Sequence, residues 1–94
     1  MFVDNVSRKI DNKYFNLIKI VDSENFVEFQ SRNTKDFWII KRNLYFDDKF
    51  PIYIYHKHPN QGYYHHHWQC YSIKQAIDSI KQHDAYKLNI RLYK

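Results

Sequence analysis

The sequence predicts an α+β fold: an antiparallel sheet of five or six strands, with one helix at about residues 72–83 packed on one face. Three observations lead to this prediction. Apolar and polar residues alternate along much of the chain, as in half-buried strands. Residues 59–62, Pro-Asn-Gln-Gly, suit the loop of a hairpin. Apolar residues at helical spacing follow the hairpin. With 94 residues, we expect a single domain, 1–94.

Strands are expected where aromatic and β-branched residues alternate with polar ones. The expected strands cover residues 14–21, 26–30, 37–46, the two arms of a hairpin at 51–70, and 86–93. In the third strand, alternation places Trp38, Ile40, Leu44 and Phe46 on one face.

The helix at 72–83 has a capping signal at its start and an apolar stripe along its length. Ser72 and Gln75 have the spacing of a capping box. The stripe consists of Ile73, Ala76, Ile77 and Ile80. We expect this helix to end at residues 83–84. Phe2, Val6 and Ile10 would line up on a further short helix at the N-terminus.

The hairpin has two chemically different faces. A four-residue loop pairs His58 with Tyr63, His56 with His65, and Ile54 with His67. One face then carries Ile52, Ile54, His56, His58, Tyr63, His65 and His67, and the other carries Tyr53, Tyr55, Lys57, Tyr64, His66, Trp68 and Cys70. Only one face can pack under the helix, and we favour the tyrosines and Trp68 for it.

The charge is distributed unevenly along the chain. The eight basic and eight acidic residues of 1–48 cancel, whereas residues 49–94 hold seven basic residues against two acidic ones, and also all six histidines. This asymmetry favours a polyanionic partner or an acidic protein surface.

The leading functional prediction is a small, non-enzymatic binding module that contacts nucleic acid through the basic, His/Tyr-rich hairpin and the helix surface. The expected contact residues are His56, Lys57, His58, Tyr63, His65, His67, Lys74, Lys81, Lys87 and Arg91.

Three alternatives remain open. The small size and aromatic-rich composition also suit a protein-binding module of a phage or mobile genetic element, such as an inhibitor of a host defence complex. The histidines at 56, 58, 65 and 67 form two His-x-His pairs that suit zinc or copper. However, no Asp or Glu lies between Asp48 and Asp78 to orient them. Acid–base cleavage of a phosphodiester by two of these histidines is the third alternative.

The remaining expectations concern partners and location. The lone Cys70 excludes an internal disulfide, and no apolar stretch approaches the roughly 20 residues that span a bilayer. We therefore expect a cytoplasmic protein with no cofactor and no membrane partner. Its oligomeric state is open, and an unpaired strand edge would allow a dimer.

Overall fold

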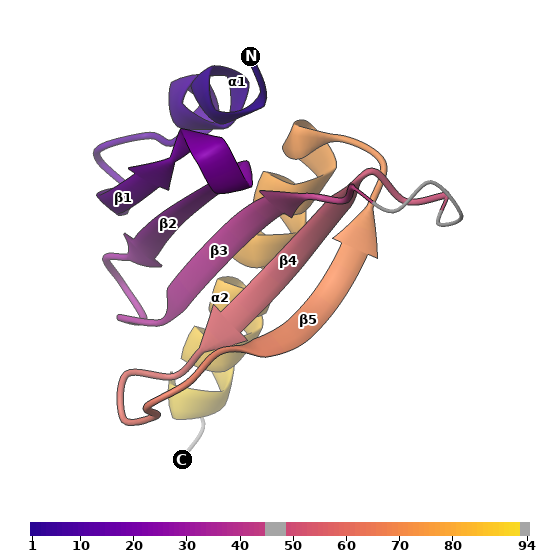
Figure 1. Ribbon diagram of the computed structural model, residues 1–94. Helices are drawn as coiled ribbons and strands as arrows, with labels where there is room; N and C mark the ends of the chain where they lie inside the picture. Colours follow the sequence, from indigo (N-terminus) through magenta and orange to yellow (C-terminus); the bar gives the residue numbers. More distant parts are fainter. Residues whose placement is uncertain (45–48, 93–94) are drawn as a thin grey trace.

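The computed structural model describes residues 1–44 and 49–92, with the side chains of all of these except 91 and 92. Figure 1 shows a five-stranded antiparallel sheet with a long helix behind it, which confirms the α+β prediction. The elements are α1 (Phe2–Lys9), β1 (Phe15–Val21), a 3-10 turn (Asp22–Glu24), β2 (Phe26–Ser31), β3 (Phe37–Arg42), β4 (Ile52–Lys57), β5 (His65–Cys70) and α2 (Ile73–Leu92).

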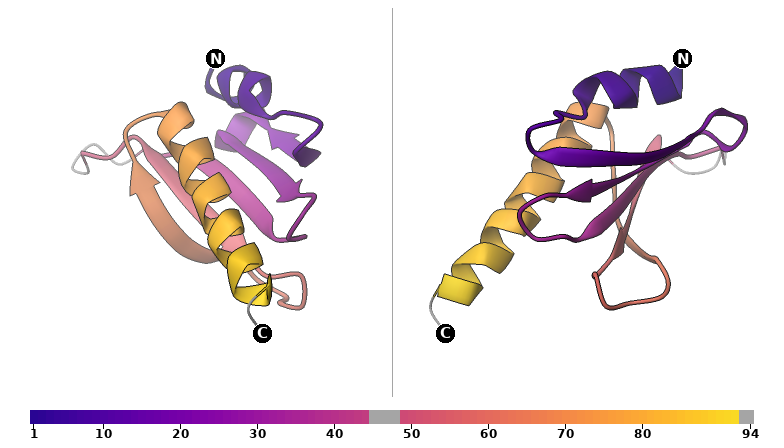
Figure 2. Two further views of the ribbon diagram at one scale, coloured as in Figure 1. Left: turned by 180° about the vertical axis from the view of Figure 1, so that it is seen from behind. Right: turned by 90° about the vertical axis from the view of Figure 1, so that its left-hand side faces the viewer.

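The sheet is a simple meander in the order β1-β2-β3-β4-β5, so each strand pairs with its neighbour in the sequence. Figure 2 shows α2 running across one face of the sheet and α1 lying over one end. We call the face toward α2 the inner face and the opposite face the outer face.

Apolar residues from the sheet and both helices form the core. The inner face contributes alternate residues such as Val27, Phe29, Trp38, Ile40 and Ile54, all of them 0% exposed. Against them pack Val3, Val6 and Ile10 from the N-terminal segment, and Ala76, Ile77 and Ile80 from α2. The short N-terminal helix expected from the sequence is therefore present, and it contributes to the core.

The expected last strand at 86–93 is wrong, because α2 continues without a break to Leu92. Neither Gly nor Pro follows His83 to end the helix. Two polar residues, Asp84 and Lys87, continue the inward stripe of α2 beyond Ile80. Because Asp84 and Lys87 are polar, the sequence shows no apolar helical stripe beyond Ile80. The alternation of Tyr86, Leu88 and Ile90 instead suggested a strand.

The third strand is shorter than expected. Trp38 and Ile40 share one face as predicted, and both are buried, but β3 ends at Arg42 and Leu44 is 55% exposed. Phe46, which was expected on the same face, lies outside the described residues.

The hairpin buries the opposite face from the one that we favoured. Ile52, Ile54 and His56 are buried under α2, while Tyr53 and Tyr55 are on the outer face. The expectation that the tyrosines pack under the helix is therefore wrong. Branched Ile52 and Ile54 fill the space beneath α2, whereas a tyrosine there would need a partner for its hydroxyl.

The predicted hairpin register is correct at one point and shifts beyond it. His56 pairs with His65 as expected, but Ile54 pairs with Trp68 instead of His67. A bulge leaves His67 without a directly opposed residue. Bulges redirect side chains, and here Trp68 comes to line the flank of α2 at 44% exposure.

Candidate functional site

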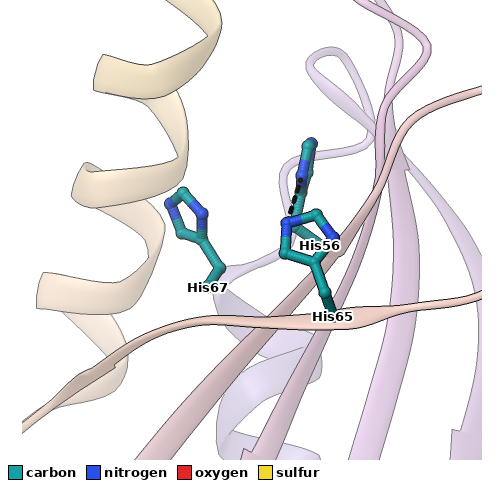
Figure 3. A group of neighbouring side chains, drawn as sticks. All are labelled: His56, His65 and His67. Carbon is teal, nitrogen blue, oxygen red and sulfur yellow. Dashed lines mark hydrogen bonds between the residues drawn. The ribbon is translucent and has the colours of Figure 1, made fainter.

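Five of the six histidines gather on the inner face, between the β4–β5 hairpin and α2. The ring of His56 lies 5.1 Å from that of His65, 5.6 Å from that of His67 and 4.9 Å from that of His83, measured between centroids. The ring of His58 is 4.5 Å from that of His56. We call these five residues, His56, His58, His65, His67 and His83, the histidine cluster. Figure 3 shows three of them, His56, His65 and His67, on the side of β4 and β5 that faces α2.

His56 is at the centre of the cluster and is held by a carboxylate that the sequence analysis did not assign to it. Its Nε2 lies 3.0 Å from Oδ2 of Asp36, which immediately precedes β3 and is 0% exposed. The Lys87 ammonium, from α2, lies 2.5 Å from the other carboxylate oxygen. Burial by itself raises the pKa of Asp36, but the hydrogen bonds and charge of His56 and Lys87 outweigh burial and lower that pKa to about 2. Asp36 is therefore an anion, and Nε2 of His56 carries the proton that it accepts.

The other nitrogen of His56 faces the histidines of β5. Nδ1 of His56 lies 3.4 Å from Nε2 of His65. His56, His65 and His67 each offer a ring nitrogen within 4.8 Å of the other two. Asp36, His56 and His83 form a second group of the same compactness. In the described residues, Nδ1 of His83 is a buried atom without a hydrogen-bond partner.

Three histidines of the cluster, His65, His67 and His83, favour the neutral form. Burial, followed by repulsion from neighbouring imidazoles, lowers the pKa of His67 to about 4. Burial also lowers the pKa of His65 and that of His83. Neutral imidazoles are the form that coordinates metals and that accepts protons.

A second buried carboxylate, Asp84, joins α2 to the first strands. It accepts hydrogen bonds from the hydroxyls of Tyr14, Ser31 and Thr34 at 2.8, 2.6 and 3.0 Å. The Ser31 hydroxyl also accepts one from Nε1 of Trp38, whose ring contacts His56 and His83. Burial and the contact with Asp84 raise the pKa of Tyr14 to about 12. Through Ser31, this hydrogen-bond network holds the Trp38 ring against His56 and His83 of the histidine cluster.

The outer face is aromatic and basic, and neither described helix covers it (Figures 1 and 2). Nζ of Lys57 lies 4.6 Å from the ring centroid of Phe37 and 5.0 Å from that of Tyr64. His66 contacts the rings of Tyr53 and Tyr55. A hollow of about 180 Å³ at the end of β3 and β4 is lined by Lys41, Arg42, Asn43, Leu44, Tyr53 and Tyr55. We call this hollow the tyrosine hollow.

The structure separates the residues predicted for nucleic-acid contact into distinct places. His56 is 1% exposed and the Lys87 ammonium is paired with buried Asp36, so neither side chain is placed to contact a nucleic acid. His58, His65 and His67 belong to the histidine cluster, Lys57 is on the outer face, and Tyr63 is 73% exposed in the β4–β5 loop.

The predicted helix residues are also dispersed. Lys74 pairs with Asp78 on the solvent side of α2, and Lys81 lies over the ring of Tyr14. Arg91 is in the last turns of α2, and its side chain lies outside the described residues.

Sequence reasoning missed Asp36, His83 and the tyrosine hollow. Asp36 is 20 residues from His56 in the chain, and the β3–β4 pairing joins them. His83 was assigned to a helix end because the continuation of α2 was not recognised. The sequence does place Tyr53, Tyr55 and Lys57 together on one strand face, but that face was expected to pack under the helix.

No protein-family model, no curated protein and no solved structure matches this chain. Among the described helices, none is both long enough and apolar enough to cross a membrane.

Proposed function

We propose that this protein binds single-stranded nucleic acid on the outer face of its sheet, centred on the tyrosine hollow. The observation that carries the proposal is the lining of that hollow, in which two tyrosine rings stand beside Lys41 and Arg42. Sheet-based modules recognise unpaired bases by stacking them on exposed aromatic rings, while cations contact the backbone phosphates.

The charge of the chain supports the same partner. The net charge is +5, and Lys57 and Lys41 lie on the same side of the sheet as the rings. Of the acidic residues there, Glu28 accepts a hydrogen bond from the Tyr64 hydroxyl at 2.6 Å, so part of its negative charge is satisfied locally. A base stacked on the outer-face tyrosines would then lie near two cations, Lys57 at one end of β4 and Lys41, which pairs with Tyr53.

The experiment is a polarisation titration of labelled single strands and duplexes across a salt series, with chelator present. We expect the single strand to bind more tightly and its affinity to fall linearly with salt on logarithmic axes. Tyr55→Ala removes one stacking platform and is expected to weaken binding by about 1–3 kcal/mol, or roughly 5- to 150-fold.

Matched variants on α2 control for general effects of charge and aromaticity. Tyr86→Ala removes a 67% exposed ring from α2 and should leave the affinity unchanged. Lys74→Ala removes the same charge as Lys57→Ala from the opposite side of the molecule and should have the smaller effect. No binding at low salt, or equal losses in each matched pair, would contradict the proposal.

A protein partner is a second candidate function, and one observation favours it. β1 is an edge of the sheet, and its Leu17, Ile18 and Ile20 are 40%, 44% and 47% exposed. An apolar edge strand can pair with a strand of another chain, because the backbone N–H and C=O groups along its outer side have no partner strand. Light scattering over a concentration series tests self-pairing: a dimer that Ile18→Lys dissociates would support it, and a monomer at all concentrations would exclude it.

A further inference from the structure

We propose that His56, His65 and His67 form a binding site for a divalent transition-metal ion of the zinc class, with Asp36 as the group that orients His56. This inference is independent of the nucleic-acid proposal, because it concerns the inner face and uses none of the residues of the tyrosine hollow.

The first support is the spacing of the nitrogens. Zinc binds imidazole nitrogens at about 2.0–2.1 Å in tetrahedral geometry, which places two ligand nitrogens about 3.3–3.4 Å apart. Nδ1 of His56 and Nε2 of His65 are 3.4 Å apart. His67 belongs to the same group, in which one ring nitrogen from each of the three histidines lies within 4.8 Å of the other two, so a small side-chain adjustment completes a three-nitrogen set.

The second support is the hydrogen bond behind His56. A metal-bound histidine generally donates its other ring N–H to a carboxylate or carbonyl, which fixes the tautomer and strengthens the ligand. His56 makes this contact, with Nε2 at 3.0 Å from the buried Asp36 carboxylate. Nδ1 therefore presents its lone pair toward Nε2 of His65. The sequence lacked a nearby acidic residue for this role, and the β3–β4 pairing brings one from 20 residues away.

The third support is the local backbone. His65 and His67 are two residues apart on β5, so both side chains point to the inner face. The bulge at His67 removes its directly opposed residue, which lets the ring turn toward His56. Because His65 is exposed, the three ligands are open to solvent on one side. A fourth position is thus left to water, as in zinc sites with three histidine ligands.

The alternative group of Asp36, His56 and His83 is less suited to a cation. The Lys87 ammonium already contacts Asp36 and would lie next to the ion. An ion on Nε2 of His56 would also displace the hydrogen bond to Asp36. We therefore assign the ion to the Nδ1 side of His56.

The test is calorimetric titration of the chelator-treated 94-residue chain with Zn²⁺, together with the visible absorption of the Co²⁺ form. We expect one ion per chain, micromolar or tighter affinity, and the intense absorption of tetrahedral cobalt. His67→Phe keeps a ring against Trp38 but has no ligand nitrogen, and His65→Ala changes an exposed side chain. Each is expected to weaken Zn²⁺ binding by at least about 100-fold, since each removes one of three ligands.

His66 provides the matched control, because it is exposed on the same strand and points to the outer face. His66→Phe and His66→Ala should bind Zn²⁺ as the wild type does. If the His66 variants lose as much affinity as the His65 and His67 variants, the ion binds a surface run of histidines and the proposal fails. Absence of saturable binding, or weak octahedral cobalt absorption, would also overturn it. Should His67→Phe fail to fold in chelator, His65→Ala decides the matter.

Discussion

Replacing Asp84 by Asn tests whether the buried carboxylate network joins α2 to the sheet as the structure indicates. Asp84 is 0% exposed and accepts three hydroxyl hydrogen bonds, two on Oδ2 from Tyr14 and Ser31, and one on Oδ1 from Thr34. An amide keeps one acceptor oxygen and places an NH₂ group, which is a donor, at the other position.

The magnitude follows from the two hydrogen bonds on Oδ2. If the amide oxygen keeps the Thr34 bond, its NH₂ group faces the hydroxyls of Tyr14 and Ser31. Hydrogen bonds to a charged acceptor contribute about 1.5–3 kcal/mol each, so losing two costs about 3–6 kcal/mol. Rotation of the Tyr14 hydroxyl to accept from the amide recovers part of this. We expect a loss of about 3 kcal/mol in the free energy of unfolding, a large share of the 5–15 kcal/mol typical of folded domains.

The assay is urea unfolding followed by tryptophan fluorescence and circular dichroism. The midpoint should fall while the slope stays unchanged, because the same surface is exposed on unfolding. Asp78→Asn on the same helix is the control, since its carboxylate is 53% exposed and its ion pair is with exposed Lys74. That variant should change stability by less than about 0.5 kcal/mol. Equal effects of the two substitutions would refute the structural role assigned to Asp84.

Three further predictions concern stability. The folded-state pKa of His67 is lowered from 6.5 to about 4, so the unfolded chain binds more protons than the folded one between these pH values. The free energy of unfolding should therefore fall as the pH drops from 6.5 toward 4. In urea unfolding, the midpoint of His67→Phe should fall less over this pH range than that of the wild type. Ile80→Ala should cost about 2–5 kcal/mol, because Ile80 is 0% exposed, whereas Ile90→Ala, at a 40% exposed position of the same helix, should cost less than about 1 kcal/mol by thermal unfolding. Lys87→Met should destabilise the fold by about 3 kcal/mol in chemical denaturation, because it leaves the buried Asp36 carboxylate without its ammonium partner; a change below about 0.5 kcal/mol would show that the ion pair is not formed.

The sequence by itself determined the local elements. Alternation in residues 26–30 and the Ile52–Ile54 pair mark strands, and the Ser72–Gln75 spacing marks a helix start, as observed: Gln75 N–H donates to the Ser72 hydroxyl at 3.1 Å. These features depend on neighbouring residues only, and they are readable because strand and helix periods differ.

Only the tertiary structure decided which hairpin face is buried, how far α2 extends and what surrounds the histidines. Alternation divides a strand into two faces but does not say which one a helix covers, and here both faces carried rings. Asp84 and Lys87 look like solvent residues in the sequence because polar side chains are seldom buried without partners. Those partners, Ser31, Thr34 and Asp36, are about 50 residues away in the chain, and folding alone brings them together.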